Sequence, residues 1–391
     1  MTWLLSRFRA GDLVEVRSKE EILATLDERG CVDGMPFMPE MLPFCGRLFC
    51  VSAVAHKTCD TITGTWVTRR LRATVHLAGV RCDGSAHGGC QADCNLFWND
   101  VWLRPVAAGN RTPAAPRNAA SVRCSETDLR TRTRQPESAN DPEPRYSCQT
   151  TRLLEATEPL PWWEPRQYLF DMATGNRSPG RVLRVLLLAT LRWFQPRMPL
   201  GYRLFKAFHD RMHLWLSGRP SPSLDGKIAR GSPTPTGRLD LKPGEYVRIK
   251  SKAEIEQTLD EAGNNRGLSF DREEMAPYCG RVCKVRSSVS KIIDEATGKM
   301  RHMKQPCIIL EDVTCKSEYA SCRLNCPRAI FSYWREIWLE RVSPPILAES
   351  QSKCGNTMAA SVALNGARLP LPQIPGDAAS GSNHPAFAQR S

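Results

Sequence analysis

The chain has 391 residues, a hydrophobic fraction of 41% and a net charge of +13. This length suggests two or three domains, and the hydrophobic fraction is ordinary for a chain that buries real cores. Its 16 cysteines are too sparse for a secreted disulfide miniprotein, yet more than packing alone requires. The positive charge favours nucleic acid, anionic lipid or acidic partners, and a solvated basic surface is the alternative.

The apolar segments predict neither a secretory signal nor a membrane span. The apolar run at the N-terminus is short and is followed by Arg7 and Arg9, whereas a secretory signal needs about 7–15 apolar residues. The longest apolar run, Val182–Phe194, is interrupted by two arginines. We therefore expect a cytoplasmic protein with reduced thiols. Cysteines in that compartment are more often metal ligands or redox groups than disulfides.

The first predicted domain spans residues 10–107 and is called segment 1 below. Residues 12–17 alternate polar and apolar side chains, as a half-buried strand does. Ser18 and Glu21 form a capping-box pattern that predicts a short helix, which we expect to end at Gly30. Two further strands are predicted over residues 47–54 and 71–77.

The next two predicted regions contrast in composition. Residues 108–145 contain few large apolar side chains and are predicted to form a flexible linker. Residues 146–218 form a basic helical connector, with one helix predicted over residues 181–194 and a second over residues 202–216. These helices could pack against a neighbouring domain with their arginines in water. The alternatives are an anionic membrane surface, nucleic acid or a dedicated protein partner.

Residues 240–343, called segment 2 below, repeat the order of segment 1. Gly11-Asp-Leu-Val-Glu-Val matches Gly244-Glu-Tyr-Val-Arg-Ile, and Met41-Leu-Pro-Phe-Cys-Gly-Arg matches Met275-Ala-Pro-Tyr-Cys-Gly-Arg. Trp98-x-x-x-Trp102-Leu103 matches Trp334-x-x-x-Trp338-Leu339. This many ordered identities at a nearly fixed offset indicates an internal duplication. Residues 344–391 have the composition of a disordered tail.

Short strands separated by turn signals favour a small β-barrel in each segment. The opening G-[DE]-x-V-x-[VI] strand resembles the first strand of SH3-like barrels. The expected fold class is therefore α+β, with two SH3-like modules joined by the linker and the connector.

The two-segment layout also resembles a group of uncharacterised bacterial proteins with tandem cysteine-rich modules. This resemblance is carried by Arg81-Cys-Asp-Gly-Ser-Ala-His-Gly-Gly-Cys, Trp162-Trp-Glu-Pro-Arg-Gln-Tyr and Tyr333-Trp-Arg-Glu-Ile-Trp-Leu. It implies a bacterial origin and no activity.

Four cysteines occupy equivalent places in the two segments, and four thiolates are what a tetrahedral zinc site needs. The segment 1 sequence adds two H-x-x-C pairs, His56-x-x-Cys59 and His87-x-x-Cys90. In the second pair, glycines at 88 and 89 allow a tight turn. The candidate metal ligands are Cys45, His56, Cys59, Cys82, His87, Cys90 and Cys94 in segment 1, with Cys279, Cys315, Cys322 and Cys326 in segment 2.

Zinc is the metal that we expect at these residues, in a structural role. The alternatives are an iron–sulfur cluster, redox or disulfide chemistry, and buried thiols that serve only packing. No catalytic residues are assigned, because the sequence contains no phosphate-binding loop, nucleophile elbow or H-E-x-x-H motif.

The favoured function is a metal-binding scaffold protein with an unidentified protein partner. The alternatives are a metalloenzyme or redox protein with its site in segment 1, and a peripheral membrane protein attached through the basic connector. Nucleic acid is a less favoured partner.

Overall fold

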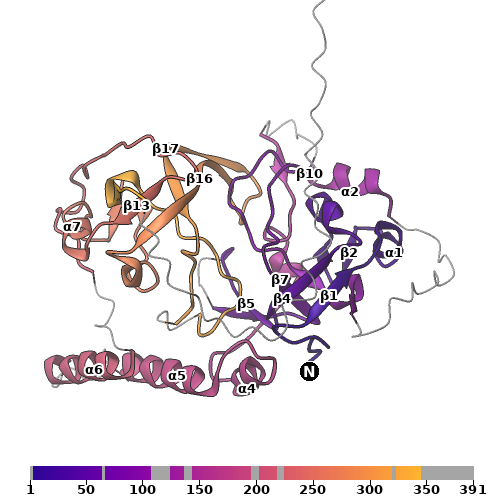
Figure 1. The fold of residues 1–391 in the computed structure, drawn as a ribbon, viewed down its shortest axis with the longest axis horizontal. Helices are drawn as coiled ribbons and strands as arrows, with labels where there is room; N and C mark the ends of the chain where they lie inside the picture. Colours follow the sequence, from indigo (N-terminus) through magenta and orange to yellow (C-terminus); the bar gives the residue numbers. More distant parts are fainter. Residues whose placement is uncertain are drawn as a thin grey trace, which may run out of the picture. The chain divides into compact units, whose positions relative to one another are not determined.

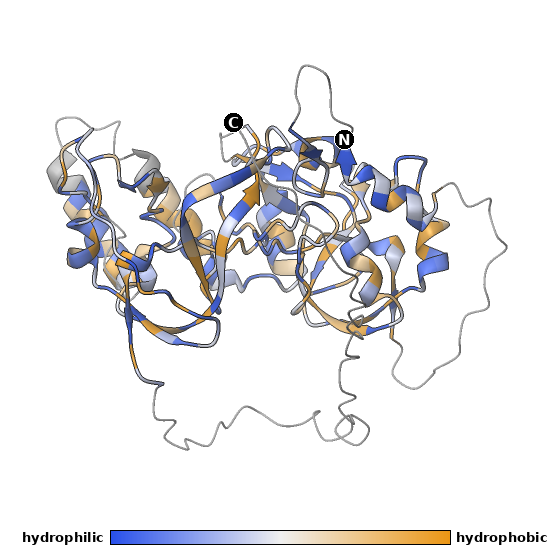
Figure 2. Ribbon diagram, turned by 90° about the horizontal axis from the view of Figure 1, so that it is seen from above, coloured by the Kyte–Doolittle hydropathy of each residue, from blue (hydrophilic) through white to orange (hydrophobic). Residues whose placement is uncertain are grey.

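The computed structural model describes residues 3–63, 67–106, 124–135, 143–194, 202–217, 224–318 and 323–344. The described chain is a mixed α+β fold with several small antiparallel sheets (Figure 1). Contacts group Met1–Pro344 into one compact unit. Hydrophobic and hydrophilic residues occur within the same strands, which is the pattern of half-buried sheets (Figure 2). The predicted disordered tail lies outside the described residues.

The largest sheet of segment 1 has the strand order β8-β7-β4-β1-β9. In β1, Leu13 is exposed while Val14 and Val16 are buried, so the predicted alternation is present. The side chains of Trp98 and Trp102 lie in the core beneath this sheet. Its strands are β1 (Leu13–Val16), β4 (Leu48–Val54), β7 (Thr74–Leu77), β8 (Trp98–Asn99) and β9 (Leu103–Pro105).

The helix after β1 begins as predicted but is shorter than expected. In α1 (Lys19–Leu23) the hydroxyl of Ser18 accepts the backbone N–H of Glu21, and the Glu21 carboxylate accepts that of Ser18. The prediction that this helix ends at Gly30 is wrong. Its last residue is Leu23, because the next N–H groups, those of Thr25 and Leu26, bond to carbonyl oxygens three residues back in tighter turns. Asp27 then accepts the backbone N–H groups of residues 29 and 31 and holds them in a further turn. The other short elements here are β2 (Cys31–Val32), β3 (Met35–Pro36), η1 (Pro39–Phe44) and η2 (Asp100–Trp102).

Part of the range predicted to be a flexible linker forms regular structure. Ser125 caps α2, and Leu129 on this helix packs into the core of segment 1. A second sheet, β12-β6-β5, joins segment 1 to the residues after the linker. The elements are β5 (Lys57–Cys59), β6 (Thr68–Arg70), α2 (Glu126–Arg132), β10 (Arg134–Gln135), β11 (Arg145–Tyr146), α3 (Leu153–Ala156) and β12 (Glu158–Pro159).

The described part of the basic connector contains both predicted helices, the short α3 and one further helix. Val182 and Val185 on α5 pack with Tyr168 on α4 and with Leu324 of segment 2. Two arginines of α5 form ion pairs with Glu318 of the same segment. Across the described ranges, no helix combines the length and apolarity that crossing a bilayer requires. The helices are α4 (Arg166–Ala173), α5 (Pro179–Phe194) and α6 (Tyr202–Ser217).

Segment 2 contains a four-stranded sheet of order β17-β16-β13-β18. β13 pairs with β16 and β18, as β1 pairs with β4 and β9, and Ser251 with Glu254 caps α7 as Ser18 with Glu21 caps α1. The SH3-like barrel stays a prediction. The elements are β13 (Tyr246–Ile249), α7 (Lys252–Glu256), β14 (Asn264–Asn265), β15 (Leu268–Ser269), η5 (Ala276–Tyr278), β16 (Val282–Ile293), β17 (Met300–Leu310), η6 (Glu336–Trp338) and β18 (Leu339–Arg341).

A buried histidine in β7 predicts a loss of stability in mild acid. The side chain of His76 is fully buried, which lowers its pKa from 6.5 to about 4, although its Nδ1 lies 2.8 Å from the carbonyl oxygen of Leu96. Above pH 6.5 the ring is neutral in both states, so its contribution is complete. As the pH falls from 6.5 towards 4, the unfolded chain takes up a proton that the folded chain excludes.

We therefore expect the free energy of unfolding to decrease over this interval, and to decrease less in a His76→Gln variant. Urea unfolding of both proteins at pH 7, 6 and 5 measures the two slopes. All other titrating groups are common to both proteins, so equal slopes would contradict a role for His76.

Candidate metal centre

Residues 82–94 form a closed loop whose ends are held by backbone hydrogen bonds. Arg81 and Asn95 form an isolated β-bridge, and the Cys82 N–H donates to the Cys94 carbonyl oxygen over 2.9 Å. Inside the loop Gly84 has φ +70°, and a Cβ at this position would collide with the backbone of Cys90. Glycine is therefore required at position 84, where the chain passes against the backbone of Cys90.

The ring of His87 lies between a carboxylate and a sulfur. Its Nδ1 is 2.6 Å from Oε1 of Glu40, and its Nε2 is 3.6 Å from Sγ of Cys82. The side chains of Glu40 and His87 are buried, and the Ala86 N–H donates to the same Oε1 over 2.8 Å. The other carboxylate oxygen of Glu40 is buried without a hydrogen-bond partner. Glu40, Cys82 and His87 together could hold a metal ion.

The distance between Cys82 and His87 matches a metal-bound pair. Tetrahedral zinc, with bonds of about 2.3 Å to sulfur and about 2.05 Å to nitrogen, places these two atoms about 3.6 Å apart. Without a metal ion, the same contact is a weak hydrogen bond between thiol and imidazole. The contact of Nδ1 with Glu40 leaves Nε2 as the ring atom that faces the sulfur. This is the usual arrangement of a metal-bound histidine supported by a carboxylate.

Cys90 is the second sulfur in contact with His87. Burial raises the pKa of the Cys90 thiol, but hydrogen bonds from His87 and from the backbone N–H groups of Ile293 and Ala92 outweigh it, so the pKa is lowered. Burial dominates at Cys82 and raises its pKa. At His87 burial is outweighed by the sulfurs of Cys82 and Cys90 and by Glu40, so the pKa is raised. The surroundings of His87 therefore favour positive charge on its ring.

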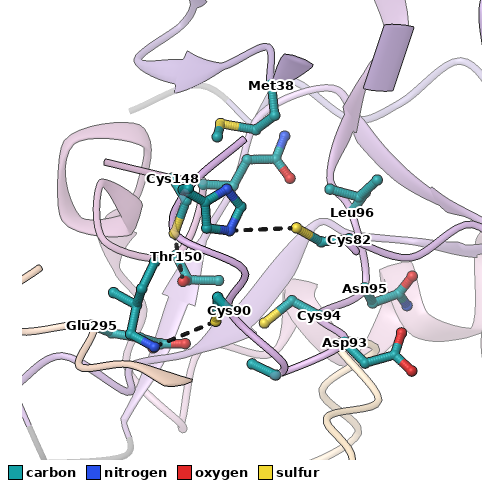
Figure 3. Close-up of a pocket in the computed structure, with 14 residues that line it drawn as sticks. Met38, Cys82, Cys90, Asp93, Cys94, Asn95, Leu96, Cys148, Thr150 and Glu295 are labelled. Carbon is teal, nitrogen blue, oxygen red and sulfur yellow. Dashed lines mark hydrogen bonds between the residues drawn. The ribbon is translucent and has the colours of Figure 1, made fainter. Parts of the chain in front are cut away.

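Cys82, His87 and Cys90 line a cavity of about 30 Å³, which is room for a small ion or a water molecule. Figure 3 shows Cys82, Cys90 and Cys94 around it, with the sulfur of Cys94 turned towards that of Cys90. Cys148 also faces the cavity, although its thiol is within 3.2 Å of the Thr150 hydroxyl. The arrangement offers one imidazole and several thiols around a single ion-sized space.

Of the ligands predicted in segment 1, four line this cavity: Cys82, His87, Cys90 and Cys94. The other three lie elsewhere in the described chain. Cys45 follows η1 and packs at the edge of the core, where burial raises its pKa to about 11. The Nε2 atom of His56 is 3.3 Å from Asp171 on α4. The side chain of Cys59 contacts Cys326.

The ligands predicted in segment 2 are not all brought together. Cys279 follows η5, and burial raises its pKa to about 11. The sulfur of Cys315 is 3.3 Å from the hydroxyl of Ser317. Cys326 contacts Cys59 of segment 1, and Cys322 lies outside the described residues.

Glu40 is the site residue that the sequence reasoning missed. It is separated from Cys82 by about forty positions, and no ligand-spacing rule connects them. The internal match offered a signal, because Glu40 precedes Met41 just as Glu274 precedes Met275. The two glutamates also act alike, since Glu274 is buried and accepts the backbone N–H groups of Lys316 and Ser317 beside Cys315.

The role of Glu40 leads to a prediction about metal affinity. We expect Glu40→Gln to weaken metal binding by about 10–100-fold, because a neutral amide holds the His87 ring less firmly than a carboxylate. Competition with a chromophoric chelator measures the affinity. Glu28→Gln is a suitable control, since Glu28 is exposed and lines no part of the cavity. Equal affinities for the two variants would remove Glu40 from the site.

The comparisons with known proteins give no family for the chain. No protein-family model matches it. No curated protein is significantly similar to it in sequence.

Proposed function

We propose that the chain is a metal-binding scaffold protein in which one zinc ion is held by Cys82, His87, Cys90 and Cys94. Glu40 orients the histidine through Nδ1. The observation that carries the proposal is the 3.6 Å contact between the partly buried Cys82 and the buried His87, next to a small cavity that Cys90 and Cys94 also line. Thiolate and imidazole ligands suit zinc, and four protein ligands are typical of a structural site.

The structural role is supported by what contacts the ligand loop. The N–H of Ile293, at the end of β16 in segment 2, donates to the sulfur of Cys90 over 3.3 Å. The side-chain oxygen of Gln91 accepts the backbone N–H groups of Ser290 and Lys291 over 2.7 and 3.1 Å. The metal loop is therefore also the surface on which β16 of segment 2 docks.

Charged contacts extend the same junction. The ammonium of Lys291 donates to the Gly88 carbonyl oxygen over 2.8 Å, and Arg286 forms an ion pair with Asp93. An ion that holds residues 82–94 in one conformation would preorganise all of these contacts. In the proposal, metal binding thus stabilises segment 1 and its attachment to segment 2. The two segments are duplicated modules that together present a binding surface to a protein partner.

Elemental analysis of the purified chain tests the proposal. We expect zinc in stoichiometric amount in the wild type, and one zinc ion fewer per chain in Cys82→Ser. Iron with a visible chromophore would instead indicate that the site carries out redox chemistry. Unchanged metal content in Cys82→Ser would contradict the proposed ligand set.

A further inference from the structure

A large cleft lies in and just before segment 2, and none of the residues that line it belongs to the metal loop. Its volume is about 970 Å³, at the upper end of the range of about 300–1,000 Å³ that is typical of ligand pockets. Residues 236–238 and 240–243, which precede β13, form one wall, and parts of β16, β17 and η6 form the others. The cleft is therefore large enough for a stretch of polypeptide.

The wall before β13 is held in place by a carboxylate. Glu336 of η6 accepts the backbone N–H groups of Leu239 and Leu241 over 2.8 and 3.0 Å. Segment 1 has a similar arrangement, since Asp100 of η2 accepts the N–H of Arg7 over 2.7 Å. Both carboxylates follow the first tryptophan of the matched Trp-x-x-x-Trp motif by two positions. Segment 1 thus has a place that corresponds to the cleft.

In segment 1 this corresponding place is covered by the chain's own connector. The side chain of Asn176, between α4 and α5, accepts the backbone N–H of Val54 and donates to its carbonyl oxygen, each over 2.8 Å. The carbonyl oxygen of Thr174 accepts the N–H of Ala10 over 2.9 Å. Val54 is fully buried. A short stretch of polypeptide therefore docks here through hydrogen bonds to the backbone of segment 1.

The matching residues of segment 2 line the open cleft. Ser288 follows the matched cysteine of its segment, Cys279, by nine positions, as Val54 follows Cys45. Pro243 precedes the matched glycine of its segment, as Ala10 does in segment 1. Ser288 and Pro243 are both exposed and both line the cleft. The place that the connector covers in segment 1 is thus open in the part of segment 2 that the structure describes.

A buried guanidinium at the cleft lacks a carboxylate partner among the described residues. Arg335 is buried, and its guanidinium donates to the carbonyl oxygens of Gln305 and Arg266 over 2.7 and 3.1 Å. Its remaining contact is with the sulfur of Cys307 over 3.6 Å, and burial raises the pKa of this thiol, which keeps it neutral. The positive charge of Arg335 is therefore not neutralised by these contacts.

Two lysines add to the positive charge. Lys242 and Lys304 are exposed and line the cleft, and no carboxylate of the described residues forms an ion pair with either ammonium. The two acidic residues of the lining are already engaged, since Asp240 pairs with Arg238 and Glu336 accepts backbone N–H groups. The charges in the cleft therefore favour an occupant with carboxylates. None of the lining residues is aromatic, so the cleft offers no ring on which nucleic-acid bases could stack.

We infer that this cleft is the partner-binding surface of the scaffold and that it takes an acidic peptide segment of the partner. Two observations support the inference: polypeptide covers the corresponding place in segment 1, and Arg335, Lys242 and Lys304 carry positive charge without carboxylate partners in the described chain. That the partner is a protein rests on the proposed function, whereas the cleft and its charge do not depend on the metal ion.

Peptide selection on the full chain tests the inference. A displayed library of short random peptides is selected on the wild type, and the enriched peptides are synthesised with a fluorescent label. We expect an excess of aspartate and glutamate in them. In fluorescence anisotropy at low salt, they should bind Lys304→Glu at least about tenfold more weakly than the wild type, because like charges then face each other. Lys227→Glu is the matched control and should bind as the wild type does, since Lys227 is exposed and lines no part of the cleft.

Three results of the selection would overturn the inference: no enriched peptide, no excess of acidic residues, or equal affinities for Lys304→Glu and the wild type. A labelled oligothymidylate that binds more tightly than the peptides and loses affinity in Lys304→Glu would also overturn it, because the cleft would then serve nucleic acid. Zinc content measured on the same preparations separates the two proposals. Zinc without peptide binding would contradict the cleft alone, and peptide binding without zinc would contradict the metal site alone.

Discussion

Replacing Cys82 with serine is expected to remove the metal ion of segment 1 and to destabilise the folded chain severely. Structural zinc contributes about 10–16 kcal/mol in small zinc-binding peptides, whereas whole domains are stable by only about 5–15 kcal/mol. Serine keeps the size of the side chain but is a poor zinc ligand at neutral pH. We expect the free energy of unfolding to fall by at least about 3 kcal/mol, measured by urea titration with circular dichroism in the presence of Zn²⁺.

The matched control is Cys50→Ser, which makes the same chemical change at an exposed position of β4. It should alter the free energy of unfolding by less than about 0.5 kcal/mol. Chelation of the wild type should reproduce the instability of Cys82→Ser and should add little to that variant. If Cys82→Ser were as stable as Cys50→Ser, the metal site would have no structural role.

Replacing Asp171 with alanine is expected to have the second large effect. This carboxylate on α4 lies 2.6 Å from the ammonium of Lys57 and 3.3 Å from Nε2 of His56, and all three side chains are fully buried. Removal of one partner from a buried ion pair costs about 3–5 kcal/mol, because the remaining charge is left without compensation. The pair anchors the connector to β5, so we expect α4 to detach from segment 1.

A surface pair provides the comparison. Arg248 and Glu340 form an ion pair in which both side chains are nearly half exposed, so Glu340→Ala should cost at most about 1 kcal/mol. The double variant Lys57→Met/Asp171→Leu should recover much of the stability that Asp171→Ala loses, since no charge remains buried. Equal losses for Asp171→Ala and Glu340→Ala in urea titrations would show that the buried pair is not important for stability.

Local sequence signals predicted the local parts of this fold. The capping boxes at Ser18 and Ser251 and the alternation in β1 depend on neighbouring residues, and the structure contains all of them. The same holds for the two connector helices, α5 and α6. The predicted end of α1 was wrong, because tighter turns at Thr25 and Leu26 and the Asp27 turn after them replace the last part of the predicted helix. The linker prediction missed α2, whose Leu129 is buried against segment 1 and whose Glu126 pairs with Lys19.

The same difference between local and long-range contacts decides which parts of the candidate site could be predicted. His87 and Cys90 are three positions apart and meet within one loop, so their spacing predicted their contact. Glu40 and the Cys59–Cys326 pair depend on how distant strands fold back on one another, and sequence spacing carries no such information. The sequence therefore overestimated the ligands of segment 1 that come together, by adding Cys45, His56 and Cys59.

X-ray absorption at the zinc edge tests the buried metal centre most directly. On the stoichiometrically loaded wild type, we predict a zinc coordination shell of sulfur at about 2.3 Å and nitrogen at about 2.0–2.1 Å. Cys82→Ser should lose sulfur from this shell. A shell of oxygen and nitrogen alone would mean that the metal lies elsewhere on the chain, and would contradict the assignment of Cys82, His87, Cys90 and Cys94 as its ligands.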